Sequence, residues 1–154
     1  MESDLDDLDN ALVDALCRDG RQSWADLASQ LGVSPPTIKQ RVARLEAMGV
    51  ITGFTAVIAP KAMGYALEAI IRFKPFPGKL HLLQRQIEEN DRIVQCDKVT
   101  GEDGFVTRVL LTEIAELDAF LEPFTDKAST HTAIVKSSPV PMRQPPTGGR
   151  PSAS

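Results

Sequence analysis

The sequence predicts an α+β protein, with an N-terminal winged-type helix-turn-helix domain followed by a C-terminal ferredoxin-like βαββαβ domain. Apolar residues recur at helical spacing through residues 5–49, and a Gly-containing turn separates two short helices there. Beyond residue 49 the spacing changes to β-branched runs that alternate with helical segments. We therefore predict a helix-turn-helix domain at 1–50, a hinge strand and linker at 51–63, a ferredoxin-like domain at 64–138 and a disordered tail at 139–154.

The composition and the two isolated cysteines favour a cytoplasmic, reducing location. The 154 residues carry a net charge of −4 and are 42% hydrophobic, with no run long enough to span a membrane and no charged-then-apolar leader. Cys17 and Cys96 are isolated, so we expect small buried hydrophobic side chains in a reducing compartment, and no disulfide framework. These features predict a cytoplasmic protein that makes no membrane contact.

The first two helices are predicted from their stripes and their ends. Residues 5–18 place Leu5, Leu8, Leu12 and Leu16 on one face, with acids in the first turn, where the helix dipole favours them. Asp19-Gly20 ends this helix. A second helix begins at Ser23, with Asp26 three residues later, and ends at Gly32.

The third helix has a strong start, a firm stop and one basic face. Ser34 is a good N-cap, Pro35 suits the first turn, and Gly49 ends the helix. Ile38, Val42 and Leu45 form its buried stripe. The residues predicted to contact DNA are Ser34, Pro36, Thr37, Lys39, Gln40, Arg41 and Arg44.

A solvated amphipathic helix is the alternative interpretation of this pattern. The distribution of charge favours DNA, because residues 34–45 contain no acid although residues 1–50 carry the whole acidic excess of the chain. This basic helix is also the second of the helix-turn-helix pair, the one that enters the major groove. Three cations on an acidic domain predict modest affinity per copy, so several copies would be needed to hold double-stranded DNA firmly.

The remainder of the chain predicts a split βαβ order. A hinge strand is expected at 50–58, followed by a strand at 66–74, a helix at 79–90, strands at 93–100 and 105–111, a helix from about 113 and a strand at 132–137. Pro123 conflicts with the last helix and should kink or shorten it. The apolar residues expected on the sheet exceed what one helix layer can bury, which predicts a dimer formed sheet to sheet; they are Val94, Cys96, Val106, Val109, Ile134 and Val135.

The chain resembles the leucine-responsive regulator and asparagine-regulator (Lrp/AsnC) family of transcription factors over roughly residues 4–138. The resemblance is carried by short motifs at fixed spacing: Leu5-Asp6-Asp7-Leu8-Asp9, Asp19-Gly20-Arg21, Leu27-Ala28, Val33-Ser34-Pro35, Arg41-Val42, Arg44-Leu45-Glu46 and Gly49-Val50-Ile51-Thr52-Gly53-Phe54. It implies a sequence-specific regulator with a C-terminal effector and oligomerisation domain. It also implies homodimers that assemble into tetramers or octamers.

The same resemblance implies a small, amino-acid-like effector near the turn between the middle strands of the second domain. The predicted effector residues are Thr100, Gly101, Glu102, Asp103 and Gly104. Many relatives carry aspartate at the position of Gly104, preceded by an aromatic residue, and this chain departs from that pattern. Backbone amides of the turn could bind a carboxylate, and Glu102 or Asp103 could bind an ammonium group. An ordinary acidic hairpin turn is the alternative.

Enzymatic activity is the rival from another class, since ferredoxin-like dimers also include small oxygenases and isomerases. His81 and His131 lie far apart without ligands at metal spacing, and no phosphate loop or nucleophile elbow occurs, so we expect no catalytic residue, metal or cofactor. RNA binding on the sheet would need exposed aromatic residues, and Phe105 is the only candidate.

The pattern supports one working hypothesis for DNA recognition. Gln40 and Arg41 would contact base edges, while Pro36 and Thr37 at the tip and Lys39 and Arg44 along the helix would make phosphate or apolar contacts. An effector would shift assembly and thereby the geometry of the bound DNA. On this hypothesis, replacing Arg41 or Arg44 by alanine weakens DNA binding without unfolding the protein.

Overall fold

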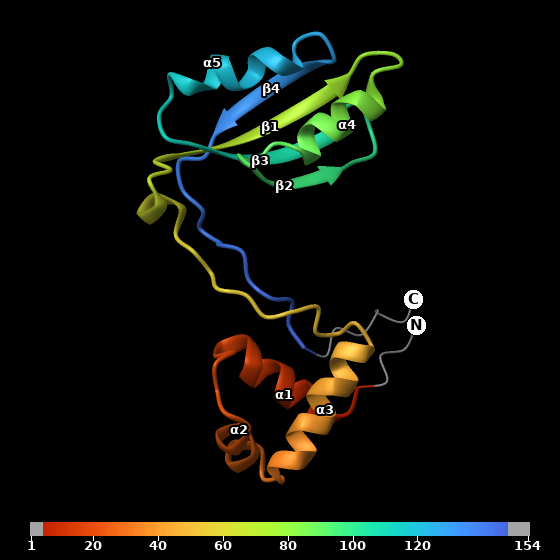
Figure 1. The fold of residues 1–154 in the computed structure, drawn as a ribbon, viewed down its shortest axis with the longest axis vertical. Helices are drawn as coiled ribbons and strands as arrows, with labels where there is room; N and C mark the ends of the chain where they lie inside the picture. The colour runs from red at the N-terminus through yellow and green to blue at the C-terminus, as the bar shows by residue number, and fades with distance from the viewer. Residues whose placement is uncertain (1–4, 148–154) are drawn as a thin grey trace. The chain divides into compact units, whose positions relative to one another are not determined.

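The computed structural model describes residues 5–147, which form two compact units (Figure 1). Residues 5–56 and 140–147 belong to the first unit, and residues 57–139 form the second. Within residues 5–147, no helix is long and apolar enough to cross a membrane.

Three helices build the first unit: α1 (Asp7–Arg18), α2 (Trp24–Leu31) and α3 (Pro35–Ala47). Ser23 and Ser34 are the N-caps of α2 and α3, as predicted, and Gly32 (φ 68°) and Gly49 (φ 71°) adopt the left-handed backbone that ends these helices. The helices bury one apolar cluster, made of Leu12, Ala15, Leu16, Leu27, Ala28, Ile38, Val42 and Leu45. The predicted buried stripe of the third helix is therefore confirmed, as are Leu12 and Leu16 of the first.

Residues 50–58, where a hinge strand is predicted, form no strand in the structure. Between residues 5 and 66 the structure has three α-helices and one short 3-10 helix, η1 (Pro60–Met63), but no strand. A β-branched run becomes a strand only when another strand accepts its backbone hydrogen bonds. Among residues 5–147 this segment has no such partner, and Val57 remains 96% exposed.

The second unit is a four-stranded antiparallel sheet with strand order β2-β3-β1-β4. Its elements follow the chain as β1 (Leu67–Pro75), α4 (Leu80–Glu88), β2 (Ile93–Lys98), β3 (Phe105–Leu111), α5 (Glu116–Leu121) and β4 (Ala128–Ile134). This order and topology confirm the ferredoxin-like prediction. A 3-10 turn, η2 (Glu122–Phe124), follows α5 directly, so Pro123 shortens the helix as expected.

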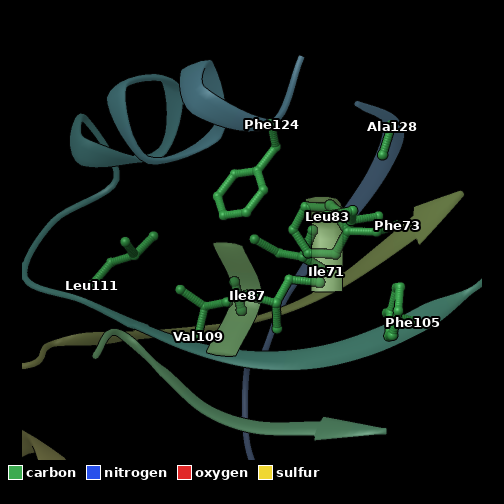
Figure 2. Packing of buried hydrophobic residues seen from close by; sticks show 10 residues of the cluster. Ile71, Phe73, Leu83, Ile87, Phe105, Val109, Leu111, Phe124 and Ala128 are labelled. Atoms are coloured by element: carbon green, nitrogen blue, oxygen red, sulfur yellow. The ribbon is translucent and has the colours of Figure 1, made fainter. Parts of the chain in front are cut away.

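The core of this unit lies between the sheet and its helices, as Figure 2 shows. Alternate residues of β1 and β3 face the same side, where Ile71, Phe73 and Val109 pack against Leu83 of α4 and Phe124 of η2. The rings of Phe73 and Phe124 lie 5.0 Å apart. Both helical segments therefore cover the same face of the sheet, and no helix of the described residues packs on the other face.

Two predictions about the sheet need correction. The last strand begins at Ala128, four residues earlier than the predicted 132–137, because Ala128 pairs with Pro75 and Thr130 with Phe73. Val109 belongs to the helix-covered core, so it does not belong to an apolar outer face. In the register of β1 and β3, the outer face mixes apolar Ile70 and Val106 with charged Arg72, Arg108 and Glu68, of which the last two form an ion pair.

Both cysteines also differ from the prediction. Cys17 and Cys96 are exposed and free, whereas small buried side chains were expected. The predicted tail lies partly outside the described residues, at 148–154. Residues 139–147 contain no helix or strand, and the Thr147 hydroxyl donates to the carboxylate of Asp14 at 2.9 Å.

Candidate nucleic-acid interface and effector turn

The start of α3 is fixed by its own side chains. The Ser34 hydroxyl accepts a hydrogen bond from the Thr37 backbone N–H at 3.4 Å, and the two hydroxyls lie 2.8 Å apart. Pro35 occupies the first position of the helix, where an N–H would have no helical partner. Because Pro35 and Pro36 have no backbone N–H and the Thr37 N–H donates to Ser34, this rigid, capped helix end offers no free first-turn amide to a phosphate.

The buried stripe decides which side chains of α3 face solvent. Ile38, Val42 and Leu45 lie in the core, and at 3.6 residues per turn Pro36 and Gln40 fall on the opposite side of the helix. Pro36, Lys39 and Gln40 are all exposed. These three residues form what we call the outward face of α3. All three belong to the predicted DNA-binding set.

Arg41 and Arg44 do not belong to the outward face. Nη1 of Arg41 donates to Oδ1 of Asp9 at 2.9 Å and also to Oδ2 of Asp6. Nη1 of Arg44 donates to Oδ2 of Asp9 at 2.7 Å. The guanidinium groups therefore face the N-terminus of α1, and this geometry gives both arginines a structural partner that the sequence analysis did not assign.

Asp9 has no exposed surface, although it is ionisable. Its carboxylate accepts from both arginines and from the backbone N–H of Asp6, at 3.2 Å. Asp6 returns the last bond by accepting from the Asp9 backbone N–H at 2.8 Å, which completes a capping box at the start of α1. A buried carboxylate is stable only when paired in this way, so Asp9 ties α3 to α1.

The electrostatics of this cluster follow from the shared hydrogen bonds. The Arg41 guanidinium holds the pKa of Asp6 below its ordinary value of 3.8, and the Asp9 backbone N–H adds to that shift. The two carboxylates in turn raise the pKa of Arg41, Asp6 most strongly. Both Asp6 and Arg41 therefore stay charged in the folded protein near neutral pH.

Sequence reasoning attributed the acids of the first turn to the helix dipole alone and so missed this cluster. A usable indication was present, because Leu5, Asp9, Leu12 and Leu16 follow one another at steps of four, three and four. That spacing places Asp9 on the buried stripe, where a carboxylate requires a cation. Arg41, between Ile38 and Leu45 at steps of three and four, is the matching position on α3.

Trp24 is a second residue that the sequence analysis passed over. It is the first residue of α2, directly after the Ser23 cap, and its side chain is 40% exposed. In a helix-turn-helix the first helix of the pair crosses the DNA backbone. A partly exposed tryptophan at the N-terminus of that helix has in its indole N–H a group that can donate to a phosphate oxygen.

The predicted effector residues lie together on one hairpin turn between β2 and β3. The Val99 N–H donates to the Gly104 carbonyl at 3.1 Å, and Gly101 adopts a positive φ of 105°. Lys74 of β1 pairs with Glu102 at 3.3 Å. Asp103 is half-buried, and Thr100 and Glu102 are exposed.

Gly104 packs too tightly for any side chain. Its N–H donates to the Phe73 carbonyl at 2.9 Å, and a Cβ atom on it would lie 2.7 Å from Cδ of Pro75. Because a proline ring cannot rotate away, the turn has room only for glycine at this position. The departure from the family pattern at Gly104 is thus coupled to Pro75 on the neighbouring strand.

A metal-binding cluster and a reactive thiol are two features that an enzyme could use for catalysis. Within residues 5–147, no group of three or more His, Cys, Asp or Glu side chains could hold a metal ion. Desolvation, with a smaller effect of Asp97, raises the pKa of the Cys96 thiol, so the thiol stays protonated near neutral pH.

A capped helix-turn-helix unit joined to a ferredoxin-like unit defines the class of two-domain transcriptional regulators. Residues 5–46 match the family model of the AsnC-type helix-turn-helix domain, and residues 68–145 match that of the Lrp/AsnC ligand binding domain. The chain belongs to the Lrp/AsnC family of helix-turn-helix transcriptional regulators.

Individual relatives are similar to this chain in sequence and fold over most of its length. The chain is 32% identical over 133 residues to the transcriptional regulator LrpA of Mycobacterium tuberculosis, which covers 86% of this chain and 89% of LrpA. Its fold is similar to that of Escherichia coli AsnC, with a TM-score of 0.82 and 30% identity; the match covers 91% of this chain and 97% of AsnC. It is also similar to the feast or famine regulatory protein from M. tuberculosis complexed with L-methionine, with a TM-score of 0.80 and 30% identity. That match covers 92% of this chain and 99% of the M. tuberculosis protein.

Proposed function

We propose that this chain is a sequence-specific, cytoplasmic DNA-binding regulator, without catalytic activity, whose assembly responds to a small amino-acid-like effector. The observation that carries the DNA-binding part is the outward face of α3, which presents Pro36, Lys39 and Gln40 at the capped end of the second helix of the pair. The effector part is supported by the ligand-binding domain of the family.

Gln40 is the principal base-contacting residue of this proposal. A glutamine amide can donate to N7 and accept from N6 of adenine at the same time, which distinguishes adenine from the other bases in the major groove. Lys39 and the hydroxyl groups of Ser34 and Thr37 would contact phosphates, and Pro36 would make apolar contact. Arg41 and Arg44 would reach DNA only after leaving the carboxylates of α1.

The proposal includes a homodimer that assembles further, to a tetramer or octamer. Support comes from apolar side chains that nothing covers within the described chain, including Phe54, Val57, Ile58 and Met63 of the linker. Only Lys39 adds a positive charge to the outward face, so one copy would bind DNA weakly. Several linked copies would multiply that affinity.

The effector is proposed to bind at the turn of Thr100, Gly101, Glu102, Asp103 and Gly104. A relative has been crystallised with L-methionine, which makes a free amino acid the first candidate class. Gly104 contributes no side chain, and Glu102 is paired with Lys74, so Asp103 is the carboxylate best placed for an ammonium group.

The DNA-binding proposal is tested by fluorescence anisotropy with a labelled duplex from upstream of the protein's own gene. Gln40→Ala should lower affinity for this duplex by about fivefold to a hundredfold while affinity for a scrambled duplex changes little, since one bidentate base contact discriminates by about 1–3 kcal/mol. Gln84→Ala on α4 is the matched control. Equal losses on both duplexes would remove Gln40 from the base-contacting role, and absence of any binding by the unmodified protein would overturn the function.

The effector proposal is tested by thermal unfolding of the full chain with each of the twenty amino acids in turn. A ligand at 100 times its Kd adds about 2.7 kcal/mol of stability, which is visible as a raised Tm. Asp103→Asn should abolish the shift, and Asp118→Asn on the exposed face of α5 should leave it intact. No stabilisation by any amino acid would exclude this class of effector.

A further inference from the structure

We propose that Asp6 and Asp9 of α1 set the sequence specificity of this regulator by holding Arg41 and Arg44 of α3 away from DNA phosphates. The inference rests on the proposed DNA binding and assigns specificity to residues that touch no base. Asp6 and Asp9 are positioning residues here, acting through the two arginines.

The contacts make the arginines poor phosphate ligands in the folded protein. Nη1 of Arg41 is shared between the carboxylates of Asp6 and Asp9, and Nη1 of Arg44 donates to Asp9. A phosphate would have to compete with these carboxylates for Nη1 and for the positive charge of each guanidinium, and one of the carboxylates is fully buried. Leaving Asp9 unpaired in the interior opposes that exchange, so the arginines stay on the protein.

The charge balance of the helix links these contacts to specificity. α3 carries three cations, Lys39, Arg41 and Arg44, and the carboxylates of α1 neutralise the last two. Affinity for any DNA sequence comes chiefly from neutralised phosphates, whereas base contacts add affinity only at the correct site. Pairing two of the three cations within the protein therefore suppresses non-specific binding and leaves the contacts of Gln40 unchanged.

Asp6→Asn gives a clean test, because asparagine caps a helix as well as aspartate does. Arg44 keeps the buried Asp9 paired in this variant, so Arg41, which has lost one of its two carboxylates, can turn to a phosphate without leaving Asp9 unpaired. Asp7→Asn is the matched control. It lies on the same turn and changes the net charge equally, but Asp7 is exposed, and within residues 5–147 the arginines pair with Asp6 and Asp9 instead. Affinities of the full-length variants would be measured by anisotropy for the promoter duplex and a scrambled duplex at several salt concentrations.

The expected result is that Asp6→Asn binds the scrambled duplex several-fold more tightly than Asp7→Asn does. The salt dependence of its binding should steepen by about one phosphate contact, a slope change near 0.9. Its ratio of promoter to scrambled affinity should fall. An equal effect of the two variants would overturn the inference, because net charge would then explain both. Weaker binding of Asp6→Asn to both duplexes would also overturn it, since that is what a merely structural pair predicts.

The outcome for the unmodified protein separates this inference from the proposed function. If it binds neither duplex, the DNA-binding function itself fails. If it prefers the promoter and Asp6→Asn retains the same preference and the same salt slope, only the specificity role of the carboxylates fails. Circular dichroism spectra of Asp6→Asn and Asp7→Asn would verify that both retain the helices of the first unit.

Discussion

Asp9, fully buried in α1, accepts a 2.9 Å hydrogen bond from Arg41 and a 2.7 Å hydrogen bond from Arg44, both in α3. This contact changes the expectation for the two arginines. From sequence alone, their removal should weaken DNA binding without affecting folding. In the structure their removal leaves the buried Asp9 carboxylate without its cations, and this lowers the stability of the folded protein as well.

Arg44→Ala should therefore destabilise the first unit. We expect a loss of about 1–2 kcal/mol, less than the roughly 3–5 kcal/mol of a fully buried pair, because Arg44 is partly exposed and Arg41 still binds Asp9. Urea unfolding followed by tryptophan fluorescence measures this directly, since Trp24 is the only tryptophan and lies in this unit. Lys39→Ala, on the exposed side of the same helix, is the control, and equal losses for the two variants would contradict the assigned role of Asp9.

The first unit should also lose stability in acid. Arg41 keeps the pKa of Asp6 below 3.8 in the folded state, so the unfolded chain takes up the proton first as pH falls. The stabilisation by Asp6 is consequently complete at pH values above 3.8 and disappears as pH falls through the lower folded value. Urea midpoints from tryptophan fluorescence, taken from about pH 5 to about pH 2, should show a shallower decline for Asp6→Asn than for Asp7→Asn. Identical declines would refute the link to Arg41.

Trp24 should report DNA binding directly. Its exposed indole lies at the N-terminus of the helix that crosses the DNA backbone, so binding should shift or quench its emission. Trp24→Phe should weaken binding to promoter and scrambled duplexes by a similar factor, because a phosphate contact carries no sequence information. An unchanged emission spectrum at saturating DNA would place Trp24 outside the interface.

Gly104→Ala should destabilise the second unit, by about 1–3 kcal/mol, since its Cβ would lie 2.7 Å from the ring of Pro75. Pro75→Ala in the same chain should recover most of the loss, because it removes the ring atoms that the new methyl group meets. Thermal unfolding of the two single variants and the double variant, followed by far-ultraviolet circular dichroism, gives the coupling energy. Additive effects would show that the two residues do not compete for space.

Sequence periodicity predicted the helices well because their determinants are local. Caps such as Ser23 and Ser34 and the stops at Gly32 and Gly49 act on residues within one turn, and the apolar stripes repeat every three or four positions. Strands depend on distant partners, and here the predictions were poorer. The run at 50–58 has good strand composition but no partner in the chain, while the polar segment from Ala128 became a strand because β1 offers it an edge.

The sequence by itself determined the two-unit layout, the helix-turn-helix, the βαββαβ order and the outward position of Pro36, Lys39 and Gln40 on α3. Only the tertiary structure decided which groups Arg41 and Arg44 bind, because their partner Asp9 lies more than thirty residues away in the chain. It also decided that Gly104 faces Pro75 across two strands. The physical reason is the same in both cases: charge pairing and close packing are set by atoms in space, and spacing along a chain specifies only which face each residue occupies.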